Sequence, residues 1–230
     1  MKISIIIPCF NEEKTLSKIV DKVLQFKLYE KEIIIVDDCS KDNTPIIIND
    51  LILKFNEIKS IKHEKNYGKG AGIKSGVKMA TGDIILIQDA DLEYNPEDYK
   101  SLLEPFLKTD ADVVYGSRFL GGKYVRLSFF WHYVANRILT TLCNTFTNLN
   151  MTDMETGYKL FKSDAIKSID LKEKSFGIEP EITVKLAKKK YIFYEVPISY
   201  SGRSYDEGKK IGLKDAFIAI YCIIKYRYFD

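Results

Sequence analysis

Short apolar runs alternate with helical patterns along the first half of this chain, and this alternation restricts the fold more than any other feature. The runs are rich in Ile and Val, as expected for strands that are buried on both faces. Strands that alternate with helices form a mostly parallel sheet with helices on both faces, so we predict an α/β fold. The runs lie at residues 3–7, 32–36, 60–63, 83–88 and 112–115.

Helical spacing of apolar residues follows most of these runs and dominates the second half of the chain. Asn11 stands where a polar residue would cap the first helix, with Glu12 and Glu13 in its first turn. Pro197 lacks a backbone donor, so we expect the last strand, at residues 191–200, to lie at a sheet edge. We expect helices at 16–26, 46–55, 66–80, 96–108, 124–150, 176–190 and 213–228, and a turn leading to a strand at 152–161.

Composition excludes several classes of protein. With 230 residues, 46% of them hydrophobic, the chain can bury one large core, and we expect a single domain over residues 1–230. A net charge of +3 does not indicate a nucleic-acid-binding protein. The four dispersed cysteines and two histidines predict reduced cytosolic thiols and no zinc site. We expect neither a secretory signal nor a membrane span, because no apolar stretch reaches ~18–20 residues.

Two carboxylates follow the central apolar run. Asp89 and Asp91 come directly after residues 83–88, and open α/β sheets bind ligands beyond the carboxyl ends of their strands. In an extended segment, side chains two residues apart point to the same side, so both acids can face one site. Two nearby carboxylates repel unless a cation lies between them, and Mg²⁺ or Mn²⁺ would suit oxygen ligands. The pattern therefore predicts a metal site open to phosphate oxygens, with a solvated loop as the alternative.

Three glycines, Gly68, Gly70 and Gly72, open the third predicted helix. Their spacing matches neither the dinucleotide-binding fingerprint after a first strand nor the phosphate-loop pattern. Two interpretations stay open. The small residues allow a helix to pack closely against the sheet, or their backbone approaches a bound nucleotide.

Seven motifs occur in a fixed order over nearly the whole chain. They are IIIPCFNEEKTL at 5–16, IIIVDDCSKDNT at 33–44, KNYGKGAGIKSGVKMATGDIILIQDADLE at 65–93, VVYGSRF at 113–119, TDMETGYKLF at 152–161, FGIEPEI at 176–182 and VPISYSGRSYDEGKK at 196–210. Together they resemble the family-2 glycosyltransferases of GT-A fold, in particular the dolichyl- or polyprenyl-phosphate mannosyltransferase branch. The resemblance implies a GT-A type sheet with helices on both faces and amphipathic helices in the C-terminal half. Residues 1–118 would bind the nucleotide-sugar, and 119–230 the acceptor.

The resemblance also assigns donor and metal positions. Those expected to bind the donor, GDP-mannose or a UDP-hexose, are Pro8, Phe10, Glu12, Val36, Asp38, Ala90, Asp91, Arg118, Arg203 and Lys209. Asp89 and Asp91 match the D-x-D motif, and Asp91 is expected to contact the metal directly. Glu93 completes the expected metal set, although relatives often carry Gln at this position. This difference leaves the choice of nucleotide open.

Charged residues in the later motifs provide the remaining expected functional positions. Arg118, Arg203 and Lys209 match positions that face the donor diphosphate or the acceptor phosphate, with solvated surface charge as the alternative. Two acids, Asp153 and Glu179, match positions near the sugar, with structural ion pairs as the alternative. The expected catalytic residues are Asp91, Asp89, Arg118, Arg203, Asp153 and Glu179. Lys159 stands where relatives often have Arg, so bidentate phosphate binding does not follow for it.

The implied reaction moves a hexose of mannose or glucose type from a nucleotide-sugar to a polyprenyl or dolichyl phosphate, with inversion. A phosphate monoester has a second pKa near ~6, so this acceptor needs no catalytic base. The metal would stabilise the leaving nucleoside diphosphate. We expect the loop at 201–212 to act as a lid, and we interpret His63 and His132 as packing or surface residues.

Aromatic residues at 129–131 and 217–228 are accompanied by Lys and Arg, a composition typical of helices that lie at a membrane surface. Trp131 and its neighbours can equally be core residues or line an apolar groove for a lipid tail. We expect peripheral association with the cytoplasmic face of a membrane, either directly or through a separate membrane protein.

Three rival functions are weighed against this interpretation. A sugar nucleotidyltransferase would show G-x-G-x-R near the first strand, where this chain has PCFNEE. A catalytically silent nucleotide-sugar-binding scaffold has no need of the full set of acidic and basic residues. A glycosyltransferase that acts on a protein or polysaccharide hydroxyl would require a general base, for which Asp153 and Glu179 are the candidates.

Overall fold

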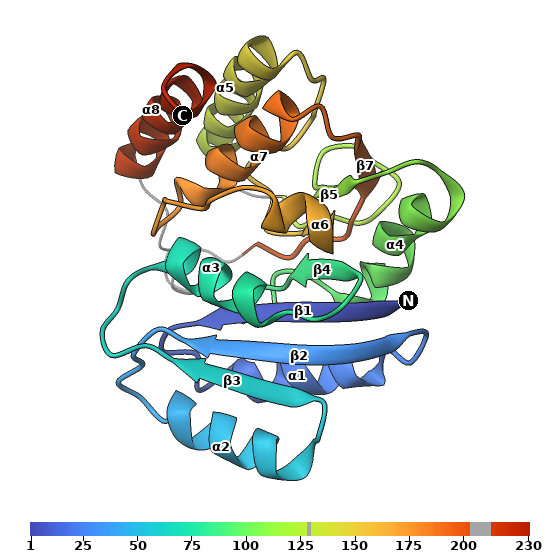
Figure 1. The fold of residues 1–230 in the computed structure, drawn as a ribbon, viewed down its shortest axis with the longest axis vertical. Coiled ribbons are helices and arrows are strands. Elements are labelled where there is room, and N and C mark those ends of the chain that lie inside the picture. Colours follow the sequence, from blue (N-terminus) through green and yellow to red (C-terminus); the bar gives the residue numbers. More distant parts are fainter. Residues whose placement is uncertain (128–129, 203–212) are drawn as a thin grey trace.

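The computed structural model describes residues 1–127, 130–202 and 213–230, and a twisted sheet forms its centre (Figure 1). In these ranges the sheet has seven strands in the order β3-β2-β1-β4-β6-β5-β7. Strand β6 runs antiparallel to both of its neighbours, and the other pairs are parallel. The strands are β1 (Lys2–Cys9), β2 (Glu30–Asp37), β3 (Ile58–Lys62), β4 (Ile84–Ile87), β5 (Val113–Ser117), β6 (Lys159–Lys162) and β7 (Phe193–Pro197).

Helices cover both faces of the sheet because successive strand residues point to opposite sides. In β1, Ile5 and Ile7 pack with α1, α2 and α4, whereas Ile6 packs with the helices of the other face. Each buried Ile contributes about 1.5–3 kcal/mol of hydrophobic stabilisation. The helices are α1 (Leu16–Gln25), α2 (Thr44–Lys54), α3 (Lys69–Met79), the 3₁₀ turn η1 (Pro96–Asp98), α4 (Tyr99–Lys108), α5 (Phe130–Thr147), α6 (Ser163–Lys167), α7 (Ile178–Lys188) and α8 (Leu213–Tyr228).

The predicted mostly parallel α/β fold is confirmed, as is the edge position of the strand that contains Pro197. The expected cap of the first helix is wrong. Helix α1 begins at Leu16 after Thr15, and Asn11 has a left-handed φ of 57°. Its side chain accepts a hydrogen bond from the backbone N–H of Lys41 at 2.8 Å. Asn11 therefore joins two loops at the end of the sheet instead of capping a helix.

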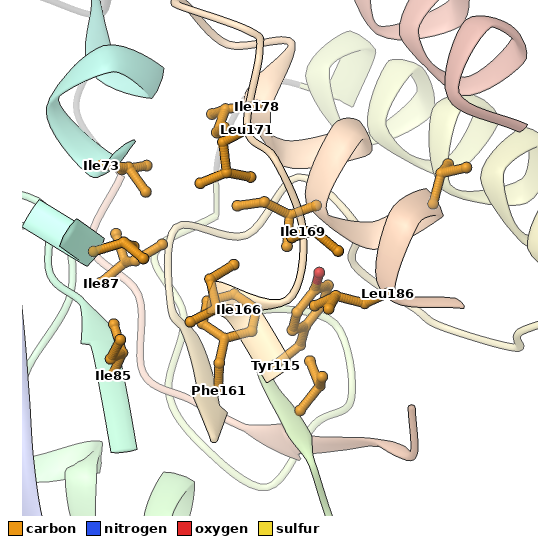
Figure 2. Packing of buried hydrophobic residues seen from close by; sticks show 14 of the residues in the cluster. Ile73, Ile85, Ile87, Tyr115, Phe161, Ile166, Ile169, Leu171, Ile178 and Leu186 are labelled. Atoms are coloured by element: carbon orange, nitrogen blue, oxygen red, sulfur yellow. The ribbon is translucent and has the colours of Figure 1, made fainter. Parts of the chain in front are cut away.

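The second half of the chain forms a three-helix layer of α5, α7 and α8 at one end of the molecule, and α2 lies at the other end (Figure 1). Figure 2 shows how β4, β5 and β6 meet this layer through buried side chains such as Phe161, Ile166 and Leu186. The hydroxyl of buried Tyr115 makes a 2.8 Å hydrogen bond with Thr183 on α7. This packing fixes α7 against the sheet and positions the side chains at the start of that helix.

Candidate active site

A cavity of about 680 Å³ opens where β1, β2 and β4 end, and its opposite wall comes from α5, α7 and α8. Two of the expected residues, Val36 and Asp153, are fully buried and do not line this cavity. Arg203 and Lys209, together with most of the expected lid at 201–212, lie outside the described residues. The expected residues that line the cavity are Pro8, Phe10, Glu12, Asp38, Asp89, Ala90, Asp91, Glu93, Arg118 and Glu179.

Asp38 follows β2 and holds the loop that leads into α3. Its carboxylate accepts backbone N–H groups from Tyr67, at 2.9 and 3.0 Å, and from Gly68, at 2.6 Å. A ring nitrogen of His63 lies 2.7 Å from the same carboxylate, and the other ring nitrogen lies 2.8 Å from the hydroxyl of Ser75. His63 is thus part of a polar network that shapes the cavity wall, a role that its position in the sequence did not indicate.

Close packing, one of the two interpretations that the sequence left open, is confirmed for the three glycines, and the approach of their backbone to a nucleotide stays a prediction. A Cβ atom at Gly68 or Gly70 would lie within 2.5 Å of a carbonyl oxygen of Lys174 or Glu173, so the loop and α3 pack backbone to backbone. Gly68 also has a φ of 100°, a conformation that favours glycine. Gly68 and Gly72 line the cavity as well. Close packing and an accessible backbone therefore occur in the same segment.

A chain of alternating charges crosses the cavity wall from β4 to α7. The ammonium group of Lys69 lies 2.8 Å from Asp89 and 3.2 Å from Glu179, and Glu179 also forms an ion pair with buried Lys159. Burial opposes the charge on Lys69, but Asp89 and Glu179 outweigh it and raise the pKa of this lysine above its ordinary value. Lys69 was not among the site residues expected from the sequence, because it is one of many lysines there.

Asp91 and Glu93 are the carboxylates that the sequence led us to expect at a divalent cation, together with Asp89. Both line the cavity, and the hydroxyl of Tyr200 donates to Glu93 at 2.8 Å. Within the described ranges, no group of three acidic, His or Cys side chains is arranged to hold a metal alone. Mg²⁺ commonly binds through one or two carboxylates together with substrate phosphates. The pair therefore fits a metal that arrives with a diphosphate, and Asp89 lies on the same cavity wall in an ion pair with Lys69.

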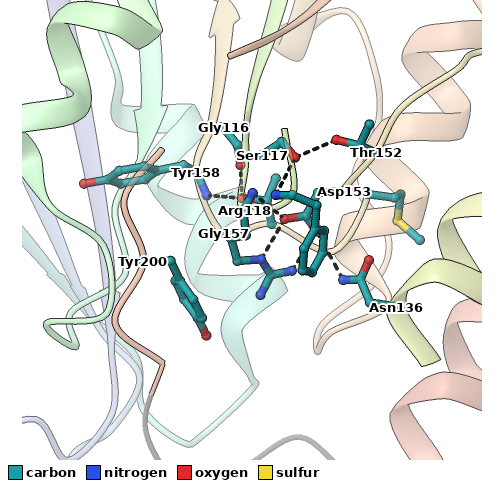
Figure 3. A network of polar contacts seen from close by, with 12 residues as sticks. Gly116, Ser117, Arg118, Asn136, Thr152, Asp153, Gly157, Tyr158 and Tyr200 are labelled. Atoms are coloured by element: carbon teal, nitrogen blue, oxygen red, sulfur yellow. Dashed lines mark hydrogen bonds and ion pairs between the residues drawn. The ribbon is translucent and has the colours of Figure 1, made fainter. Parts of the chain in front are cut away.

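Arg118, just after β5, is fixed by the buried carboxylate of Asp153 (Figure 3). Its Nε and Nη2 atoms donate to the two carboxylate oxygens at 2.6 and 2.7 Å, and Asn136 on α5 donates to the same group at 3.1 Å. Burial opposes the charge, but Asp153 raises the pKa of Arg118 above its ordinary value. The guanidinium also lies 5.1 Å from the ring centre of Tyr200. The cation is therefore held permanently at the cavity wall.

One acidic residue of the site, Glu155, was not among the expected residues. It lies in the loop between α5 and β6 and lines the cavity, and its buried Oε1 atom has no hydrogen-bond partner in the described part of the chain. Burial and the neighbouring Glu179 raise the pKa of this carboxyl to about 7. The sequence shows Glu155 only as one more acid in the TDMETGYKLF motif.

Comparison with solved structures defines the fold. The fold matches glucosyl-3-phosphoglycerate synthase from Mycobacterium tuberculosis in complex with UDP, with a TM-score of 0.75 and 16% identity over 98% of this chain and 80% of that one. The same enzyme with Mn²⁺ and UDP-glucose gives a TM-score of 0.73 and 17% identity over 98% and 78%. The fold is therefore that of the GT-A glycosyltransferases, as expected.

A family model described as glycosyl transferase family 2 matches residues 4–170, and the chain belongs to this family. A dolichol-phosphate mannosyltransferase from Pyrococcus furiosus is 30% identical over 92% of this chain, which spans 60% of that relative's length. A UDP-N-acetylglucosamine–dolichyl-phosphate N-acetylglucosaminyltransferase from Methanococcus voltae is 30% identical over 96% of this chain and 94% of its own. The resemblance inferred from the motifs is confirmed.

Proposed function

We propose that this chain transfers a hexose from a nucleotide-sugar to a polyprenyl or dolichyl phosphate, with inversion at the anomeric carbon. The observation that carries the proposal is the composition of one continuous cavity. Acidic side chains lie at its strand end, a fixed arginine lies in its wall, and apolar residues of α5 and α8 lie at its far side. The two relatives whose names include dolichol or dolichyl phosphate support the same acceptor.

The donor end of the cavity suits a nucleoside diphosphate. Pro8, Phe10 and Asp38 form the part expected to hold the nucleoside, and residues 1–118 supply this half of the site. A divalent cation, Mg²⁺ or Mn²⁺, would neutralise the charge that develops on the leaving diphosphate, with Asp91 and Glu93 as its ligands. Manganese or magnesium accompanies UDP in structures of the M. tuberculosis enzyme. The nucleotide is GDP or UDP, and the sugar is of mannose or glucose type.

Arg118 is the residue that would hold the acceptor phosphate. Its pair with Asp153 uses Nε and Nη2, which leaves Nη1 outside that pair for an anion in the cavity. A preorganised cation reduces the repulsion between the acceptor phosphate and the donor diphosphate without a rearrangement during the reaction. We propose that Arg203 and Lys209 add to this positive charge.

A hydroxyl acceptor is the less favoured alternative. The two acids considered as general bases, Asp153 and Glu179, each lie in an ion pair with a buried or nearly buried cation. Their carboxylate oxygens already accept hydrogen bonds from Arg118 and Lys159, and Asp153 does not line the cavity. A phosphate acceptor, which is already ionised near neutral pH, requires no such base.

The exposed face of α5 and α8 supports peripheral contact with a membrane. Along α8, the exposed side chains Phe217, Tyr221, Ile224 and Tyr228 recur at helical spacing, and Trp131 on α5 is 75% exposed. In the described ranges, no helix has the length and apolarity needed to cross a bilayer. We propose that this face lies on the cytoplasmic surface of a membrane, alone or beside a membrane protein partner.

The test is release of nucleoside diphosphate from GDP-mannose, UDP-glucose and UDP-N-acetylglucosamine, each with Mn²⁺ and with or without a polyprenyl phosphate. We expect release from one donor that depends on the lipid phosphate and is lost in Asp91→Ala. Lipid-independent transfer to a sugar or peptide hydroxyl would favour the alternative acceptor. Saturable nucleotide binding without turnover of any donor would favour a silent scaffold.

A further inference from the structure

Glu155 occupies a position that the proposed reaction does not explain. Its side chain lines the cavity between α5 and α7, and its Oε1 atom is buried without a hydrogen-bond partner among the described residues. A buried polar atom without a partner is costly and uncommon in folded proteins. An atom of this kind on a cavity wall indicates that a ligand supplies the missing partner.

The charged groups that face Glu155 are already paired with one another. Arg118 is held by Asp153, in the same loop as Glu155, and Lys159 on β6 is held by Glu179 on α7. From α5, the thiol of Cys143 faces Glu155 and has a pKa raised to about 12, chiefly by burial, so it is neutral. Among the described residues, a negative charge on Glu155 would therefore have no counter-ion of its own. Burial and Glu179 accordingly raise the pKa of the Glu155 carboxyl to about 7.

We propose that Glu155 binds the acceptor phosphate as a neutral carboxyl, donating a hydrogen bond from the cavity wall beside Arg118. This inference rests on the proposed phosphate acceptor. A protonated carboxyl has one O–H donor, which an anionic oxygen accepts strongly. The ionised form has no donor and would repel the phosphate. Phosphate binding and protonation of Glu155 therefore favour each other.

This linkage predicts a specific pH dependence. Above about pH 7 the acceptor is fully dianionic, because its second pKa is near ~6. In that range the KM for the acceptor should rise about tenfold per pH unit as Glu155 loses its proton. His132 is a second titratable group that lines the cavity, so the Glu155→Gln variant is needed to assign the pH dependence to Glu155.

Kinetics of two variants test the role of the proton. Glu155→Gln keeps a neutral donor, so it should retain the wild-type acceptor KM at pH 7 within about threefold and lose the rise at higher pH. Glu155→Ala should raise the acceptor KM about tenfold at pH 7, because the hydrogen bond is missing. Glu57→Gln, on an exposed loop far from the cavity, is the matched control. An unchanged pH profile in Glu155→Gln, or a loss of kcat as in removal of a general base, would overturn the proposal.

A second experiment separates this inference from the proposed function. Carboxyl ¹³C NMR of the glutamate-labelled chain should show one resonance that titrates near pH 7, is absent in Glu155→Gln, and moves to higher pH on addition of farnesyl phosphate. A midpoint near the ordinary ~4.3, or one that farnesyl phosphate leaves unchanged, would overturn the role of Glu155 whatever the enzyme assay gives. If the expected titration is observed but lipid-dependent turnover is not, the proposed reaction is contradicted. The proposal that Glu155 binds a phosphate as a neutral carboxyl is then still supported.

Discussion

At the scale of single residues, Gly157 determines how closely the loop before β6 approaches the D-x-D carboxylates. A Cβ atom there would lie 2.3 Å from Oδ2 of Asp89 and 2.9 Å from Cε2 of Tyr94. We predict that Gly157→Ala displaces Asp89 and lowers the rate of sugar transfer about 100-fold, since a shift of ~1 Å in an active site has that effect. Nucleoside diphosphate release measures the rate. Glu57→Gln, at an exposed position outside the cavity lining, is the control; a wild-type rate in Gly157→Ala would contradict the prediction.

Glu155 should also make the stability of the fold depend on pH. Its pKa is raised to about 7 in the folded chain, chiefly by burial, against ~4.3 for an unperturbed glutamate. The folded state therefore holds the proton more tightly than the unfolded state. The contribution of this group is fully favourable below about pH 4 and is lost as the pH rises through 7, by at most about 4 kcal/mol.

We predict that Glu155→Gln removes this loss of folding stability at higher pH, because the glutamine side chain does not titrate. The free energy of unfolding of the variant should match that of the wild type near pH 5 and exceed it by about 1–3 kcal/mol near pH 8. Urea unfolding at the two pH values measures the difference. The same difference at both pH values would show that Glu155 does not titrate in this range, and Glu57→Gln should show no gain at the higher pH.

At the scale of elements, the edge strand β7 positions the arginine of the active site through an intermediate loop. The carboxylate of Glu195 accepts the backbone N–H of Thr152 at 2.8 Å and that of Asp153 at 3.1 Å, and Asp153 in turn holds Arg118. We predict that Glu195→Ala destabilises the fold by about 1–3 kcal/mol, because two N–H groups lose their acceptor. Turnover should fall as well, because Asp153 moves away from the arginine.

Thermal unfolding and acceptor-dependent turnover measure these two effects. The matched control is Glu104→Ala on α4, where the glutamate is exposed and forms a surface ion pair with Lys108. Exposed pairs of this kind contribute little, so neither readout should change appreciably in the control. Turnover that stays at the wild-type level in Glu195→Ala would show that β7 does not position Arg118.

The sequence predicted the elements that local patterns specify, and it did not predict contacts between distant segments. The apolar runs of β1, β2 and β4 each indicate a buried strand from their own residues. The sheet and its helices could therefore be predicted. Asn11 looked like a helix cap because the local pattern does not contain the loop at Lys41 that its side chain contacts. Lys69 and Glu155 lie inside two of the quoted motifs, but nothing local distinguishes them from the other charged residues there. Their roles depend on α5, α7 and β6, which only the folded chain brings together.

At the scale of the whole molecule, the aromatic face of α8 lies at one end of the structure and α2 at the other (Figure 1). We predict that replacing Phe217 and Tyr221, 72% and 63% exposed, by Ser lowers affinity for vesicles of anionic phospholipid at least about tenfold. Transfer of aromatic area out of water drives such binding. Vesicle sedimentation measures it, with Leu53→Ser as the control, because Leu53 is 87% exposed on α2. Nucleotide binding should be unchanged in both variants, and equal vesicle affinities would place the membrane contact elsewhere.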